Sequence, residues 1–168
     1  MFKIRATVSG DRERISDLYK EVSKQRKGIA ACEEEITHYY LDTIYNKAKH
    51  EGIQLVAQLE SGLVAAEIHC SKLGPKVFNH VLGDLTFVVH SEYQGKGLGK
   101  LIFTELLKIV IETRPEILRV ELIARESNTN AISLYKKLGF VVEGRFEKRI
   151  KNEDGSLEAD IPMAWIRK

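Results

Sequence analysis

Three alternate glycines and two lysines lie within one short segment, Gln94-Gly95-Lys96-Gly97-Leu98-Gly99-Lys100. The segment follows an apolar run that suits a buried strand, and it precedes apolar residues at helical spacing. Glycine has no Cβ, so the backbone can adopt unusual angles there and approach a ligand closely. Successive N–H groups at the start of a helix can point at one anion, and the lysines add positive charge. The segment therefore predicts a binding site for a pyrophosphate.

Two common pyrophosphate-binding loops do not match this segment. A Walker A loop needs a glycine five residues before Gly99, where Gln94 stands, and a serine or threonine after Lys100, where Leu101 stands. The dinucleotide fingerprint has the spacing G-x-G-x-x-G, whereas the spacing here is G-x-G-x-G. Taken alone, the glycines also fit a turn that binds no ligand.

A second segment lies downstream, Asn128-Thr129-Asn130-Ala131-Ile132-Ser133-Leu134-Tyr135-Lys136-Lys137-Leu138-Gly139-Phe140. It has the pattern N-x-x-A-x-x-L-Y-x-x-x-G-F, on a predicted short helix that Gly139 ends. The glycine-rich segment has the pattern Q/R-x-x-G-x-G/A. Together the two segments resemble the GNAT superfamily of acetyl-CoA-dependent N-acetyltransferases. They are well separated and correctly ordered, so the joint match is more specific than either one.

The resemblance implies how acetyl-CoA, the cosubstrate, is bound. The backbone of Phe87, Val88 and Val89 would pair with the pantetheine arm like an added strand. Amides from the glycine-rich segment would hold the pyrophosphate; they belong to Gln94, Gly95, Lys96, Gly97, Leu98, Gly99 and Lys100. Asn128 would contact the cofactor near the pantetheine, and Tyr135 would stand near the thioester sulfur.

Direct attack of an amine on the thioester, in a ternary complex, needs a general acid and a general base. A backbone N–H can stabilise the oxyanion, and Tyr135 can act as the general acid on the leaving thiolate. In the ribosomal alanine N-acetyltransferase subgroup a glutamate precedes the asparagine by five residues, but that position here is Ile123. Glu121, two residues earlier on the same strand face, is the narrow preference for the base. The other candidates are Asp84, Glu67, His69 and a bound water, whereas His90 fits an exposed loop contact better than a catalytic role.

These residues need a framework of strands and helices, and the sequence predicts the order βααβββαβαββ. The predicted strands cover about residues 2–7, 53–59, 63–71, 81–90, 118–124, 140–150 and 156–166. The first predicted helix ends at about residue 23, and a loop follows over 24–31. The other predicted helices cover about 33–50, 97–113 and 129–138. The glutamates at 33–35 are expected in the first turn of the second helix. We expect an α/β fold, with a mixed, mostly antiparallel sheet flanked by helices, in a single N-acetyltransferase domain over residues 1–168.

The sequence does not identify the amine acceptor. In the GNAT fold the acceptor usually lies between the first two helices and the last hairpin, which are here about residues 25–40 and 146–160. A small amine, an amino acid, a polyamine and a protein N-terminus all stay open. A non-catalytic acyl-CoA-binding or regulatory module on the same fold is the main alternative to an enzyme, and a nucleotide-binding protein is a weaker one.

The composition bears on partners and location. Lys and Arg number 26 against 24 Asp and Glu, for a net charge of +2, so nucleic acid is not an expected partner. Cys32 and Cys70 form no CxxC pattern and the five histidines show no metal spacing, so no metal is expected and a reducing, cytoplasmic setting is simplest. No apolar run is long enough to span a bilayer, so no membrane partner is expected. A homodimer through an exposed strand or the C-terminal hairpin stays open.

Overall fold

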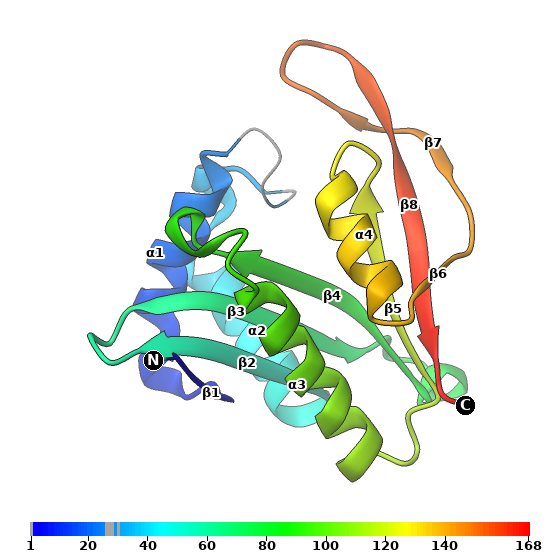
Figure 1. Ribbon diagram of the computed structural model, residues 1–168, viewed down its shortest axis with the longest axis horizontal. Coiled ribbons are helices and arrows are strands. Elements are labelled where there is room, and N and C mark those ends of the chain that lie inside the picture. Colours follow the sequence, from blue (N-terminus) through cyan, green and yellow to red (C-terminus); the bar gives the residue numbers. More distant parts are fainter. Residues whose placement is uncertain (1, 26–28, 30) are drawn as a thin grey trace.

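An eight-stranded sheet forms the centre of the protein (Figure 1). The computed structural model describes residues 2–25, 29 and 31–168. The strands are β1 (Phe2–Ala6), β2 (Gly52–Leu59), β3 (Val64–Lys72), β4 (Val81–Val89), β5 (Arg119–Arg125), β6 (Val141–Val142), β7 (Phe146–Lys151) and β8 (Leu157–Ile166). Their spatial order is β1-β2-β3-β4-β5-β8-β6, and β7 also pairs with β8. Within the described chain every pair is antiparallel except β4 with β5, so the predicted mixed, mostly antiparallel α/β fold is confirmed.

Helices cover both faces of the sheet. They are α1 (Arg12–Ser23), α2 (His38–Glu51), α3 (Leu98–Thr113) and α4 (Thr129–Lys137). The first two lie on one face and the last two on the other (Figure 1). Adjacent residues of β2 serve the two sides, because successive strand residues point to opposite faces. Leu55 packs in the cluster with α3, and Val56 packs in the cluster with α1. Of the described helices, none combines the length and the apolar character needed to cross a membrane.

The parallel strands β4 and β5 separate soon after they meet. Two residue pairs join them, Val81 with Arg119 and Leu82 with Val120. From there β5 pairs with β8 as far as Arg125, while β4 continues beside β3. Figure 1 shows the two strands diverging. Among the described residues, the β5-facing edge of β4 has no strand partner over residues 83–89, so its N–H and C=O groups there are free of sheet pairing.

Two predicted elements are wrong in detail. The glutamates at 33–35 form a separate 3₁₀ turn and do not open α2. The helix begins at His38 instead, because the Thr37 hydroxyl caps it by accepting a hydrogen bond from the Tyr40 N–H at 3.2 Å. The loop predicted over residues 24–31 falls partly on residues 26–28 and 30, which lie outside the described part of the chain.

The second correction concerns the strand predicted over 140–150, which is split into β6 and β7. Both pieces pair with β8, on either side of Pro162. Proline has no N–H to donate and its carbonyl lies on this edge of β8, so the ladder on the β6–β7 side is interrupted there, whereas the pairing with β5 continues past it. The Glu143 N–H donates to the Pro162 carbonyl at 3.0 Å, and the chain then leaves β8 until Phe146.

Gly52 joins α2 directly to β2 and has no room for a side chain. A Cβ there would lie 2.0 Å from the Cys70 carbonyl oxygen. We expect Gly52→Ala to lower the free energy of unfolding by about 1–3 kcal/mol, because the backbone of β3 must shift. Urea denaturation would measure the change. Gly10→Ala is the matched control, since nothing lies within 4 Å of a Cβ there; an equal loss in both variants would contradict the steric reason.

Candidate active site

The glycine-rich turn has the backbone geometry that the sequence predicts. Gly95 and Gly97 have φ angles of 72° and 81°, in the left-handed region that favours glycine. Gly97 immediately precedes α3, and no other atom lies within 4 Å of a Cβ built at either position. The turn therefore leaves open space beside its backbone, where a ligand could approach.

The first turn of α3 adds backbone donors at the same place. The first N–H groups of an α-helix have no acceptor within the helix, and here they belong to Leu98, Gly99 and Lys100. The Leu98 side chain is buried in the core, so only its backbone faces this space. A Cβ at Gly99 would lie 2.7 Å from Cζ of Phe87 on β4. Glycine at this position thus lets α3 pack closely against the end of β4.

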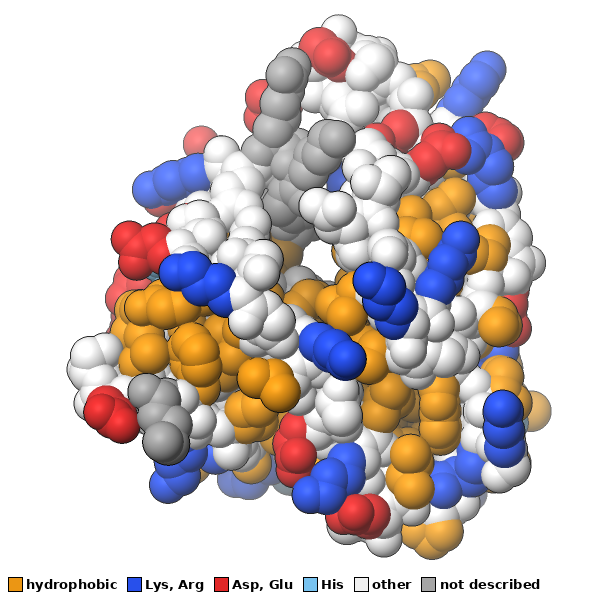
Figure 2. Space-filling view, in the orientation of Figure 1, with side chains coloured by type: hydrophobic (Ala, Val, Ile, Leu, Met, Phe, Trp, Pro, Cys, Tyr) orange, Lys and Arg blue, Asp and Glu red, His pale blue; other side chains and the backbone are white. Residues whose placement is uncertain are grey.

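Polar side chains hold and surround the turn. The Gln94 amide donates to the Val89 carbonyl at 2.9 Å and to the Gln25 side chain at 3.0 Å, which ties the turn to the end of β4. Lys96 is exposed, with Nζ 5.4 Å from the centre of the Tyr93 ring. Lys100 is also exposed. Figure 2 shows Lys and Arg side chains among hydrophobic patches on this face of the molecule.

His90 precedes the turn and has a local structural contact. Its Nδ1 accepts a hydrogen bond from the Glu92 N–H at 3.3 Å. Its ring lies 5.8 Å from that of Tyr93. These contacts fit the predicted loop position, and contact with a cofactor stays a prediction.

Tyr135 lies on α4 within an aromatic group on the α3 side of the sheet. Its ring centre is 5.5 Å from that of Phe103 and 6.1 Å from that of Phe140. Burial raises the pKa of Tyr135 to about 12, because an ionised phenolate would lose its hydration. The phenol therefore keeps its proton at neutral pH and can donate it. Asn128 opens the same helix, where its Oδ1 accepts from the Ala131 N–H at 3.2 Å.

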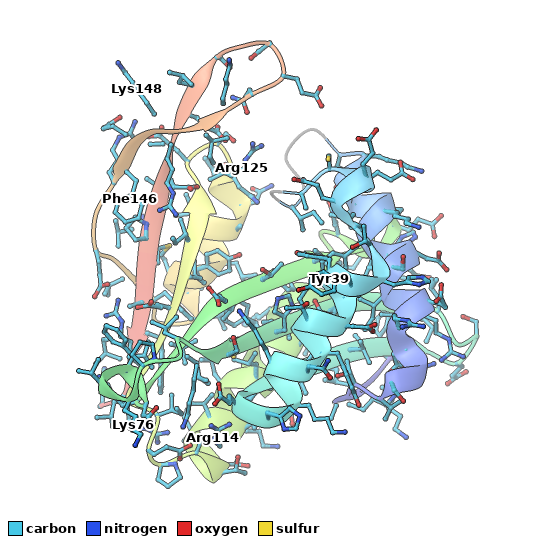
Figure 3. All side chains as sticks on the ribbon, turned by 180° about the vertical axis from the view of Figure 1, so that it is seen from behind. Tyr39, Lys76, Arg114, Arg125, Phe146 and Lys148 are labelled. Carbon is cyan, nitrogen blue, oxygen red and sulfur yellow. The ribbon has the colours of Figure 1, made fainter. Side chains whose placement is uncertain are left out.

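A cavity of about 710 Å³ lies on the opposite, α2 side. Its wall combines α2 from Tyr40 to Ala48, the β3–β4 pair, β5, β8, and the segment before β7. Figure 3 is drawn from this side, with α2 in front of the sheet and Phe146 on the hairpin strand opposite. Leu85, Leu122 and Met163 also line the cavity, although they belong to the core cluster of the α3 side. The cavity therefore reaches into the opening between β4 and β5.

Three of the predicted base candidates line this cavity: His69, Asp84 and Glu121. The Glu121 carboxylate accepts a hydrogen bond from Arg119 Nε at 2.7 Å. Asp84 is largely exposed and lies 3.6 Å from Lys47 Nζ. Asp84 also has a φ of 50°, at an irregularity where the register of β3 with β4 shifts.

The fourth candidate, Glu67, is fully buried beneath the cavity. Its Oε2 accepts from the Tyr19 hydroxyl at 2.7 Å, and its Oε1 accepts from the Gln54 amide at 2.8 Å. His69 Nδ1 lies 3.0 Å from the same Oε1. Burial, followed by the charge of Glu67, raises the pKa of Tyr19 well above its usual range.

Sequence reasoning missed several residues of the cavity wall. Arg119 lies at the centre of an ion-pair cluster, because it contacts Glu143 as well as Glu121. Thr43, Ile44 and Lys47 are on α2 beyond the predicted acceptor region of residues 25–40. The apolar stripe of that helix was the available signal, but core packing explains such a stripe equally well.

The comparisons with known proteins settle the family. The family described as acetyltransferase (GNAT) matches over residues 13–140. This chain belongs to the GNAT acetyltransferase family. The sequence-based resemblance is thus confirmed, and the match includes both the glycine-rich turn and the segment that carries Tyr135. No curated protein matches this GNAT chain.

Solved structures agree with this family. A GNAT-family acetyltransferase from Streptococcus pneumoniae is 24% identical, with a TM-score of 0.83 over 99% of this chain and 100% of that one. A ribosomal-protein-alanine N-acetyltransferase from Brucella melitensis is 20% identical, with a TM-score of 0.84 over 98% and 99%. A phosphinothricin acetyltransferase from Sinorhizobium meliloti, in complex with AcCoA, is 19% identical, with a TM-score of 0.83 over 98% and 88%. At these identities the likeness shows the GNAT fold.

The Arg119 cluster makes a pH-dependent prediction. The hydrogen bond from Arg119 lowers the pKa of Glu143. We expect Arg119→Gln to raise this pKa back towards the usual range, which carboxyl NMR titration would measure. A carboxylate with a lowered pKa stabilises the fold above its usual pKa, and the contribution is lost as the pH falls. Because Glu143 is well exposed, that contribution is below about 1 kcal/mol.

Arg114→Gln is the matched control for this titration. Arg114 holds Glu116 at 2.6 Å in the same way, so its removal changes Glu116 and leaves Glu143 unaffected. If the titration of Glu143 is the same with and without Arg119, the ion-pair cluster does not form in solution.

Proposed function

We propose that this GNAT acetyltransferase transfers an acetyl group from acetyl-CoA to a primary amine, by direct attack in a ternary complex. The observation that carries the proposal is the cavity on the α2 side, which reaches into the opening between β4 and β5. An amine entering from that side would meet an acetyl group held along β4 from the other side. Neither substrate then has to cross the sheet.

Acetyl-CoA fits the α3 side of the opening. The free edge of β4 offers backbone donors and acceptors to the pantetheine arm, including those of Phe87, Val88 and Val89. Val88 and Val89 have buried side chains, so they would contribute through the backbone. The left-handed glycines and the first N–H groups of α3 suit a pyrophosphate, and the exposed lysines beside them supply positive charge. The related Sinorhizobium enzyme was solved with AcCoA.

Tyr135 is the proposed general acid. It packs in the same cluster as Leu85 and Leu122, which border the opening from the two diverging strands. Its raised pKa keeps the phenol protonated at neutral pH, so a proton is present beside the thioester sulfur when the carbon–sulfur bond breaks. Asn128 caps α4 and so fixes the helix that carries this phenol. We also propose that Asn128 contacts the pantetheine.

The charged groups of the cavity suit an amine. Asp84, Glu121 and Glu143 supply three carboxylates, against the two cations of Lys47 and Arg119. An ammonium group entering this space is therefore attracted more than an anion is. The acceptor class stays open among small amines, amino acids, polyamines and protein N-termini.

An amine-panel assay tests the proposed reaction. We expect free thiol to be released from acetyl-CoA when at least one class of amine is added, and the acetylated amine to appear in equal amount by mass spectrometry. The panel contains peptides, polyamines, amino acids and aminoglycosides. Tight binding of CoA without amine-dependent thiol release would instead identify a non-catalytic acyl-CoA-binding module. Thermal stabilisation by ATP or NAD but not by CoA would contradict acetyl-CoA as the donor.

Tyr135→Phe tests the general acid. The variant keeps the aromatic packing but loses the proton, so we expect turnover to fall by about 100-fold with little change in CoA affinity. Steady-state kinetics and calorimetry would measure the two quantities. Tyr45→Phe is the matched control, since Tyr45 lies on α2 but does not line the acceptor cavity. Unchanged turnover in Tyr135→Phe would remove this residue from the acid role.

A further inference from the structure

Glu67 is a buried carboxylate without a permanent cationic partner. It is fully inaccessible to solvent, and its neighbours are the Tyr19 hydroxyl, the Gln54 amide and the His69 ring. In the described part of the chain, no lysine or arginine contacts it, and His69 is the one side chain able to bring it a positive charge. We propose that His69, held by Glu67, is the proton-accepting group for the amine. The inference rests on the proposed acetyl transfer.

The hydrogen bonds around Glu67 determine which ring nitrogen of His69 carries the proton. The Tyr19 hydroxyl has one hydrogen, and its 2.7 Å contact with Oε2 uses it. It therefore has none to give to His69 Nδ1, which lies 3.3 Å away. Nδ1 itself lies 3.0 Å from Oε1, and an ionised carboxylate only accepts hydrogen bonds. With Glu67 ionised, Nδ1 is therefore the donor, and the lone pair of the neutral ring is on Nε2.

His69 is in the right place to act on the acceptor. Its ring lines the cavity, and it is paired across the sheet with Thr86, which also lines the cavity. Residues paired in this way point to the same face. Thr86 immediately precedes Phe87, the first of the β4 residues proposed to pair with the pantetheine arm of acetyl-CoA. The base would therefore stand next to the reacting carbonyl on the acceptor side.

The other carboxylates on the cavity wall are engaged in ion pairs. Glu121 is bound by Arg119 at 2.7 Å, and Asp84 lies near Lys47 on an exposed edge. A histidine that serves as the base needs one ring nitrogen fixed by a hydrogen bond and the other ring nitrogen accessible to the substrate. His69 meets that condition, because Glu67 binds Nδ1 and leaves Nε2 for the amine.

The proton balance of the reaction closes with His69 and Tyr135. His69 Nε2 takes one proton from the incoming ammonium group, so that its nitrogen can form the bond to the acetyl carbon. Tyr135 gives its proton to the sulfur as the carbon–sulfur bond breaks. The second proton lost by the amine nitrogen restores the phenol. The proton on His69 then passes to solvent through the cavity, and Glu67 stabilises the imidazolium until it does.

Several titratable groups face this pair. Tyr19 of α1 and Tyr40 of α2 lie on the helix side, and burial together with Glu67 raises the pKa of each. Asp84 and Glu121 line the same cavity as His69. Both tyrosines stay neutral over the working range, and the two carboxylates already have cationic partners. Of these groups, His69 is the one that is held by a buried carboxylate and also lines the cavity.

The test compares pH profiles of turnover for His69→Gln and the wild type. We expect turnover to fall by about 100-fold and the acidic limb of the profile to disappear, because glutamine fills the space but does not accept a proton. The profiles are measured with two amines of different pKa. If the acidic limb reflects protonation of the amine itself, its midpoint shifts when the amine is changed. His50→Gln is the matched control, because His50 is exposed at the end of α2 and does not line the cavity.

Two more variants separate a base from a merely structural histidine. Glu67→Gln should move the acidic limb to lower pH, because the charge that stabilises the imidazolium is gone. His69→Ala should regain turnover when imidazole is added. Loss of the limb in Glu121→Gln but not in His69→Gln would overturn the proposal, as would unchanged turnover in His69→Gln. If the wild type acetylates none of the amines, the proposed acetyl transfer itself is refuted. That result is distinct from one in which the wild type is active but His69 is not the base.

Discussion

The early divergence of β4 from β5 is the constraint on which the rest of this structure depends. A parallel strand normally satisfies its backbone groups on both edges, yet β4 does so on the β5 side only at Val81 and Leu82. The sheet holds together because β5 finds a full-length partner in β8 and β4 finds one in β3. The opening between these paired strands joins the α2 side of the sheet to the α3 side.

The two sides of the opening are built with different chemistry. On the α3 side, glycines and aromatic rings produce close packing, as when Gly99 lets Phe87 lie against the helix. On the α2 side, a hydrogen-bonded group extends under the cavity from Thr7 through Gln54 to Glu67 and Tyr19. Buried polar groups are costly unless they are paired. Pairing each member of this group holds His69 rigidly where it meets the cavity.

Much of this arrangement follows from local sequence, and the rest depends on contacts between distant residues. The glycine-rich turn was predictable because positive φ angles and the start of a helix have local signatures at Gly95 and Gly97. The start of α2 was missed because the glutamates at 33–35 suit a first helical turn as well as they suit a separate one. The site on the α2 side was harder to predict. Glu67 and His69 look like ordinary strand residues until Tyr19, from the first helix, is placed against them.

The interruption of β8 pairing at Pro162 affects how this enzyme could change over time. The chain that leaves β8 between Glu143 and Phe146 forms part of the cavity wall, with Gly144 between them. The glycine-rich turn lies on the other face of the sheet and shares no residue with this segment. Insertions or substitutions around Gly144 can therefore reshape the α2-side cavity while the glycine-rich turn keeps its geometry. Selection can therefore change the lining of this cavity through one short surface segment, independently of the glycine-rich turn.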